Sequence, residues 1–329
     1  MLPVAELHLH IEGTLEPELL VTLARRNDVA LPTTDIIELR NRYRFGSLRE
    51  FLDLYYASMR VLRTGQDFYD LASAYLSRAV KAGVRRAEIF FDPQSHTGTG
   101  VPIEAVFEGL TGAIADARPG ISADLIPCFL RDLGADAAMA TLEQALPFRD
   151  QFIAVGLDSS EIGYPPSLFA GVYARAAAEG LRLVAHAGEE GPPEYVREAL
   201  DLLHAERIDH GVRSMEDRDL VARLSEERVP LTVCPLSNVA LKVVATMGEH
   251  VLPSMLDAGI PATVNSDDPA YFGGYIDDNF SALTGTFGLS AEVLAALARN
   301  SFEASFAPDA DKRRWLAEVD AWASGADGG

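Results

Sequence analysis

Short apolar segments alternate with longer amphipathic segments from one end of the chain to the other. Eight of the apolar segments have the length and the β-branched content of buried strands; they cover residues 4–9, 87–91, 123–130, 152–157, 181–185, 207–209, 231–233 and 262–264. Strands that alternate with helical segments form parallel βα units. Eight such units predict a (β/α)₈ barrel, the TIM-barrel fold of the α/β class.

Glycine positions and regular spacing support one repeating unit. Predicted helices end at Gly83 and Gly180 directly before the next strand, where glycine supplies the left-handed residue that closes a short helix-to-strand loop. His186 and His210 follow consecutive strands and lie 24 positions apart, which fits a strand, a loop and a crossover helix. We therefore predict a single domain over residues 1–329.

One segment departs from this spacing. Residues 14–85 separate the first two strands and contain several helical patterns, one of which begins at the capping-box residues Ser47 and Glu50 and runs to Met59. We predict a helical insertion over the barrel mouth, and a flexible tail at residues 323–329. Four aromatic residues of the insertion either line a pocket at the mouth or form ordinary core: Phe45, Phe51, Tyr55 and Tyr56.

The amino-acid composition limits the possible binding partners and the cellular compartment of the protein. The 329 residues are 48% hydrophobic, enough for a large core, and 49 acidic against 28 basic residues give a net charge of −21. This charge repels polyanions, so we expect neither nucleic acid nor an anionic membrane as a partner. No apolar run approaches the roughly 18 residues of a membrane span and no signal-peptide pattern is present, so we expect a cytoplasmic protein. Cys128 and Cys234 lie in apolar segments and are expected to be buried thiols.

The ends of the predicted strands carry the candidate chemistry. His8 and His10 are two positions apart in the first strand, so both imidazoles point to the same face. His186 ends the fifth strand and Asp267 follows the eighth, and the C-terminal ends of barrel strands meet around one axis. Three imidazoles and one carboxylate suit one Zn²⁺ ion, with Fe²⁺ and Mn²⁺ as alternatives. A two-metal site in such barrels commonly needs a modified lysine near the end of the fourth strand, and no lysine lies there.

Proton-handling groups are predicted beside this metal site. Glu189 follows His186 by three positions and could carry a proton, the alternative being a solvated loop acid. His210 could orient or deprotonate the attacking water, or be a satisfied interior histidine. Asp268 points away from its neighbour Asp267 and could contact the substrate. The remaining histidines are expected outside the site, in a loop or at solvated or half-buried helical positions: His96, His204 and His250.

With these residues in place, the chain resembles the adenosine/adenine deaminase family of metal-dependent (β/α)₈ hydrolases. The resemblance covers nearly the whole chain and rests on five motifs, at residues 6–13, 186–189, 207–212, 234–238 and 265–269. It implies hydrolytic deamination of a purine at C6 by a metal-activated water. It also implies Zn²⁺ on the four ligands above, Glu189 as the proton donor to the purine N1, His210 assisting the water, and Asp268 bonded to the purine N7.

Within this family the choice lies between free base and nucleoside. The strings at residues 156–163, 189–193 and 269–274 look like those of adenine deaminases, which implies conversion of adenine to hypoxanthine and ammonia in purine salvage. We hypothesise that Ser159 or Glu161, at the end of the fourth strand, fills the space of a ribose and accepts the imidazole N–H of free adenine. Gly156 of the same string is a further candidate for substrate binding.

Two alternatives stay open at this point. The first is deamination of adenosine or of another 6-aminopurine, such as an N6-substituted adenine. The second is a catalytically silent purine-binding protein. A small purine is the expected partner in each case, and the sequence indicates no oligomeric state.

Overall fold

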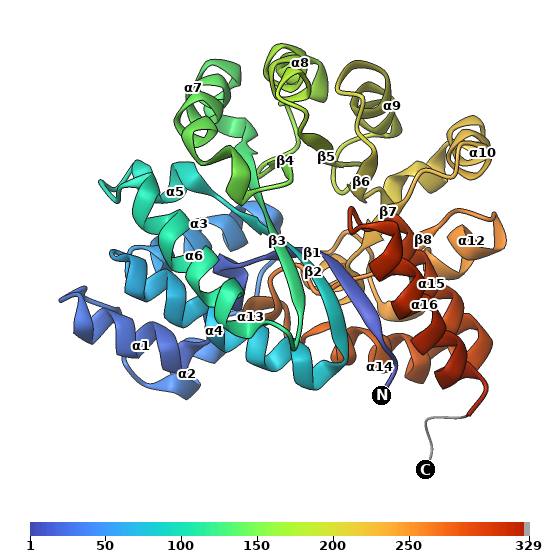
Figure 1. The fold of residues 1–329 in the computed structure, drawn as a ribbon, viewed down its shortest axis with the longest axis horizontal. Helices are drawn as coiled ribbons and strands as arrows, with labels where there is room; N and C mark the ends of the chain where they lie inside the picture. Colours follow the sequence, from blue (N-terminus) through green and yellow to red (C-terminus); the bar gives the residue numbers. More distant parts are fainter. Residues whose placement is uncertain (326–329) are drawn as a thin grey trace.

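Eight parallel strands form the centre of the molecule (Figure 1), a computed structural model that describes residues 1–325. The strands are hydrogen-bonded in chain order. They are β1 Val4–His10, β2 Val84–Phe91, β3 Ser122–Leu130, β4 Ala154–Asp158, β5 Arg182–Ala187, β6 Arg207–His210, β7 Leu231–Val233 and β8 Ala262–Val264. The amide of His10 donates to the carbonyl of Asp267 (3.0 Å), and the amide of Asp267 donates to the carbonyl of His8 (3.1 Å), so the chain after β8 pairs with β1. The predicted (β/α)₈ barrel is confirmed.

Helices surround this barrel. Between β1 and β2 lie the 3₁₀ turn η1 Glu12–Thr14 and the helices α1 Pro17–Arg26, α2 Ile36–Asn41, α3 Leu48–Met59 and α4 Gly65–Ala82. The later helices up to β8 are α5 Pro93–Thr97, α6 Ile103–Ala117, α7 Ala135–Ala145, α8 Ala170–Ala178, α9 Pro193–Leu202, α10 Arg218–Glu226, α11 Pro235–Ala240 and α12 Leu252–Asp257. The chain continues through α13 Pro269–Phe272, α14 Ile276–Phe287, α15 Ala291–Ala304 and α16 Asp309–Ala323.

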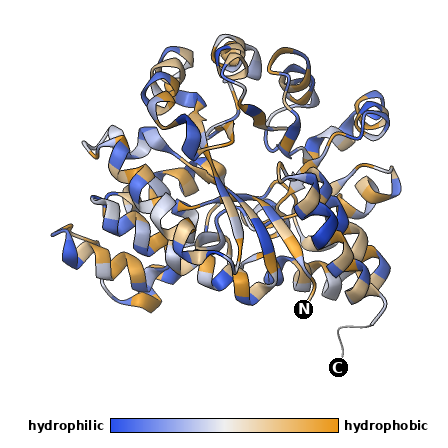
Figure 2. Ribbon diagram, viewed as in Figure 1, coloured by the Kyte–Doolittle hydropathy of each residue, from blue (hydrophilic) through white to orange (hydrophobic). Residues whose placement is uncertain are grey.

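The outer helices are amphipathic. Figure 2 shows hydrophobic and hydrophilic residues mixed along each of them, and α10, for example, buries Leu220 and Leu224. Gly83 ends α4 with φ = 93°, a left-handed conformation, and a Cβ there would lie 2.6 Å from the carbonyl oxygen of Leu2. A side chain at this position would therefore block the turn into β2.

The predicted insertion divides into two parts. Helix α3 begins where the Ser47 hydroxyl accepts the amide of Glu50 (3.3 Å), but the Glu50 carboxylate accepts the amide of Gly46 (2.8 Å), one residue before the expected partner. Helix α3 packs its aromatic side chains against Tyr271 and Phe272 of α13. Helix α4 packs against α6 in the outer layer. The assignment of the whole chain to one domain stays a prediction.

Both cysteines are buried with free thiols, as expected. Within residues 1–325, none of the helices combines the length and the apolar composition that a bilayer crossing requires. Of the predicted tail, Ala323 is the last residue of α16, and residues 326–329 lie outside the described part of the chain.

Candidate metal centre and substrate cavity

Four buried donors converge at the C-terminal end of the barrel: His8 and His10 of β1, His186 of β5 and Asp267 beyond β8. The Nε2 atoms of His10 and His186 are 3.2 Å apart, and the Asp267 carboxylate lies 3.3 Å from His8 Nε2. One ligand atom from each of the four lies within 4.8 Å of every other. His8 Nε2 is buried without a hydrogen-bond partner, which an ion would satisfy. The donor set therefore fits one divalent transition metal.

The other nitrogen of each imidazole faces a polar group of the barrel. His8 Nδ1 lies 3.0 Å from the Thr232 hydroxyl and 3.2 Å from the Thr232 carbonyl. His10 Nδ1 lies 3.6 Å from the Asp158 carboxylate. Partners of this kind fix the orientation of a ligating histidine and leave its Nε2 for the metal.

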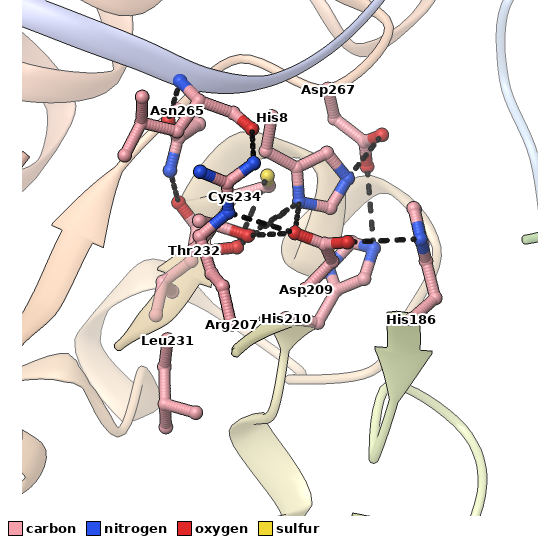
Figure 3. Close-up of polar contacts among 12 residues, drawn as sticks. His8, His186, Arg207, Asp209, His210, Leu231, Thr232, Cys234, Asn265 and Asp267 are labelled. Atoms are coloured by element: carbon pink, nitrogen blue, oxygen red, sulfur yellow. Dashed lines mark hydrogen bonds and ion pairs between the residues drawn. The ribbon is translucent and has the colours of Figure 1, made fainter. Parts of the chain in front are cut away.

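Asp209, which the sequence analysis did not select, lies behind two of these histidines (Figure 3). Its Oδ2 is 3.6 Å from His186 Nδ1 and its Oδ1 is 4.0 Å from His8 Nδ1. The Thr232 hydroxyl donates to it at 2.7 Å, and Arg207 Nε lies 3.8 Å away. The sequence contained a signal, because Arg207 and Asp209 place two charges on one face of a short buried strand.

Burial keeps two imidazoles of the site neutral. It lowers the pKa of His10 to about 4 and that of His210 to about 3. A neutral imidazole has a lone pair for a metal or a proton. Each can therefore act as a ligand or a base at neutral pH.

Glu189 and His210 lie beside the four donors, as their strand ends predicted. His210 Nε2 is 3.7 Å from Glu189 Oε1 and 3.8 Å from Asp267 Oδ2. Burial, with Asp267 nearby, raises the pKa of Glu189 well above its usual range. A raised pKa favours the protonated carboxyl, the form that a proton donor needs. Asp268 lines the same cavity.

Glu161 has a different position from the one predicted. Its carboxylate accepts the backbone amides of Gly188 (2.7 Å), Glu189 (3.1 Å), Glu190 (2.9 Å) and Gly191 (2.7 Å). It does not line the cavity, so it fixes the loop that carries Glu189 and does not face a substrate.

Gly156 also lies away from the cavity. A Cβ there would lie 2.5 Å from the sulfur of Cys128 inside the barrel, so this glycine allows β3 and β4 to approach each other. Of the three residues predicted to contact substrate around β4, only Ser159 lines the cavity. Glu161 and Gly156 lie outside the cavity lining, which the sequence could not show because it does not reveal which way a side chain turns. Their role in substrate binding stays a prediction.

Helix α3 supplies an apolar wall of the cavity, with contributions from Leu48, Phe51, Leu52, Tyr55 and Tyr56. Phe272 and Leu241 complete it. Phe45 lies behind this wall, with its ring centroid 5.3 Å from that of Phe51. A planar ring can pack against these side chains while its edges meet the polar groups.

Three site residues adopt left-handed backbone conformations: Ser159 (φ 70°), His210 (φ 63°) and Asp267 (φ 63°). Each lies at or just beyond the end of a strand. For a residue with a side chain this conformation costs roughly 1–2 kcal/mol, and such residues gather at functional sites.

Two further carboxyls of the cavity escaped the sequence analysis: Asp92 after β2 and Asp158 at the end of β4. Both are buried, and the Oδ1 atom of each has no hydrogen-bond partner. Burial and the neighbouring Asp158 raise the pKa of Asp92 well above its usual range. The signal was available, because both follow apolar strands just as the metal-binding candidates do.

The three remaining histidines differ from one another. His204 is exposed, in line with the prediction. His96 is buried in α5 and not in a loop, with Nε2 2.8 Å from Glu12 Oε1. His250 is buried directly after a 3₁₀ turn, with Nε2 3.2 Å from Asn238 Oδ1. Both buried histidines were misplaced because their partners come from other parts of the chain.

Comparison with known proteins places this geometry in a family. The sequence profile described as adenosine deaminase matches residues 3–322. The chain belongs to the adenosine deaminase family. Adenine deaminase of Streptomyces coelicolor is 61% identical over 98% of this chain and 96% of that protein, and the adenine deaminase of Sphingopyxis alaskensis is 58% identical over 98% and 95%.

Solved structures agree with this membership of the adenosine deaminase family. The crystal structure of an adenine deaminase from Arthrobacter aurescens superposes with a TM-score of 0.97, at 55% identity over 98% of this chain and all (100%) of that one. An amidohydrolase from Burkholderia ambifaria with bound Zn has a TM-score of 0.89, at 29% identity over 98% of this chain and 92% of that one. The resemblance inferred from the motifs is confirmed.

Proposed function

We propose that this member of the adenosine deaminase family hydrolyses adenine to hypoxanthine and ammonia. The observation that carries the proposal is the buried Glu189 carboxyl beside four convergent metal-binding side chains, at one end of a cavity with an aromatic wall. Adenine as the substrate is supported by the names of the relatives that are 58% and 61% identical to this chain.

We propose one divalent metal ion per chain, held by His8, His10, His186 and Asp267. Zn²⁺ suits this donor set, and Fe²⁺ or Mn²⁺ could replace it. When bound, the ion supplies Lewis acidity and lowers the pKa of a water molecule to near neutrality.

The side chains around the ion divide the proton transfers. His210 is neutral and takes the proton of the water that attacks C6. Glu189 gives its proton to N1, so that the ring can accept the electron pair of the C6–N1 double bond as the new C6–O bond forms. Asp268 holds N7 by a hydrogen bond. The amino group then leaves C6 as ammonia, with a proton returned from these groups, and the carbonyl of hypoxanthine remains.

The test is ultraviolet monitoring of adenine, adenosine and N6-methyladenine with enzyme of known metal content. We expect kcat/KM for adenine to exceed that for adenosine by at least about 100-fold, since a site built around a hydrogen bond discriminates strongly. A preference for adenosine or N6-methyladenine would show that the preferred purine, and not adenine, is the substrate. A metal-loaded protein that binds adenine but converts none of the three would identify a silent binder.

A further inference from the structure

We propose that Asp92 binds the N3/N9 edge of a free purine base and thereby determines that the base, and not its nucleoside, is accepted. This inference rests on the proposed adenine deamination and assigns the group that recognises the substrate. Asp92 takes the role that the sequence suggested for Ser159 or Glu161.

The strand order places Asp92 opposite the reacting groups. Glu189 follows β5, His210 ends β6 and Asp268 follows β8; these three residues form what we call the reaction wall. In a barrel whose strands run in order from β1 to β8, β2 faces β6 and β4 faces β8. A purine held at C6, N1 and N7 by the reaction wall therefore presents its N3/N9 edge to the side of β2 and β4.

That side carries hydrogen-bonding groups that the proposed reaction does not use. Asp92, Asp158 and Ser159 line the cavity there, together with Tyr56, whose hydroxyl donates to Ser159 Oγ at 3.0 Å. We call these four residues the recognition wall. The carboxyls of Asp92 and Asp158 contact each other, and Oδ1 of each is buried without a further hydrogen-bond partner.

Asp92 is the better placed of the two carboxyls. Asp158 Oδ2 lies 3.6 Å from His10 Nδ1, whereas the closest grouping that includes Asp92 places one of its carboxyl oxygens within 4.8 Å of His10 and of Asp158. Asp92 is only 2% exposed, and Glu12 fixes its backbone by accepting its amide at 3.0 Å. Glu12 is itself oriented by His96, 2.8 Å away. The backbone from which the Asp92 side chain projects is thus held by a buried carboxylate that is itself fixed.

The chemistry of free adenine matches this carboxyl. Adenine carries a hydrogen on N9, and a carboxyl oxygen accepts that hydrogen bond whether or not the acid is protonated. A nucleoside has carbon in place of this hydrogen. Its sugar would occupy the space beside Asp92 and leave the buried carboxyl without a partner, which is strongly unfavourable.

The experiment compares adenine with 9-methyladenine, which differs at this one position. We expect the wild-type enzyme to prefer adenine by at least about 100-fold in kcat/KM. In Asp92→Ala, turnover of adenine should fall while the methyl group gains space, so the preference should shrink by about 10–100-fold. Asp92→Asn keeps an accepting oxygen and should retain most of the preference. Asp132→Asn, which removes an exposed carboxylate at the same end of the barrel, should retain all of it.

Several results would overturn the inference. They are equal use of both purines by the wild type, an unchanged preference in Asp92→Ala, or an equal loss in Asp132→Asn. If Asp92→Ala does not fold, as judged by circular dichroism, Asp92→Ser takes its place, and an unchanged preference in that variant overturns the inference.

A failure of the proposed function would look different. The wild-type enzyme would then leave adenine unconverted, and calorimetric dissociation constants for adenine and 9-methyladenine would replace kcat/KM. Tighter binding of adenine, lost in Asp92→Ala, would support the role of Asp92. Equal binding, or binding of neither purine, would overturn it.

Discussion

The reaction wall and the recognition wall face each other across one cavity but differ in how their polar groups are satisfied. His210 Nε2 of the reaction wall lies 3.7 Å from Glu189 Oε1 and 3.8 Å from Asp267 Oδ2. Carboxyl oxygens of Asp92 and Asp158 on the recognition wall lack hydrogen-bond partners, as does Oδ1 of Asp268, the proposed substrate contact of the reaction wall. The protein preorganises the groups that move protons. The groups that select a ligand keep a hydrogen-bonding atom free to bind it. This difference predicts that changes on the two walls affect different kinetic quantities.

The largest effect is expected on the reaction wall. Glu189→Gln removes the proton that N1 must receive but keeps the shape of the side chain, so we expect kcat to fall by about 100- to 10,000-fold. The dissociation constant for adenine should change only a few-fold. Single-turnover kinetics and calorimetry measure the two quantities. A large loss of adenine binding with little loss of kcat would show that Glu189 binds the substrate and does not transfer the proton.

The second effect concerns the support of the metal ligands. The Asp209 carboxylate lies 3.6 Å from His186 and 4.0 Å from His8. Asp209→Asn removes its negative charge, so metal affinity should fall by about 10- to 100-fold. Chelator competition followed by metal analysis measures this. Asp257→Asn, at an exposed position, is the matched control. Equal metal affinities of Asp209→Asn and Asp257→Asn would show that Asp209 does not support the metal ligands.

The third effect tests the loop behind Glu189. Glu161→Gln replaces one of the two accepting oxygens by an amide nitrogen, so part of the four backbone hydrogen bonds is lost. We expect kcat to fall by about 10-fold with unchanged metal content and an unchanged preference for adenine over 9-methyladenine. Loss of that preference would instead show that Glu161 takes part in substrate recognition.

The last effect is on acid stability and not on the reaction. Burial lowers the pKa of His250 to about 4, below the usual value near 6.5. The unfolded chain therefore takes up a proton first, and the stability due to neutral His250 is present above about pH 6.5 and is lost as the pH falls towards 4. His250→Gln should reduce this acid-induced loss by at most about 3 kcal/mol.

Urea unfolding at pH 8 and pH 5 measures this difference. Wild type and His250→Gln should each be measured at both values, because the pH 8 data separate the change in packing from the change in titration. Parallel losses of stability in the two proteins would show that His250 is not responsible.

The sequence alone determined the barrel and most of the reaction wall. Strand and helix patterns depend on local periodicity, so all eight strands could be placed, with boundaries that differ by a few residues, as for β2, which begins at Val84 and not at residue 87. The positions of His8, His10, His186 and Asp267 followed from one topological rule, because parallel strands bring their C-terminal ends to the same place. The same rule could have revealed Asp92 and Asp158.

Only the tertiary structure decided which partner each loop side chain meets. Glu161 looked like a substrate contact in the sequence, yet its carboxylate binds backbone amides 27–30 positions further along the chain. His250 was expected to be solvated or half-buried, yet it is buried against Asn238. Such pairings depend on how loops turn above the barrel. That direction is set by long-range packing and not by the periodicity of the local sequence.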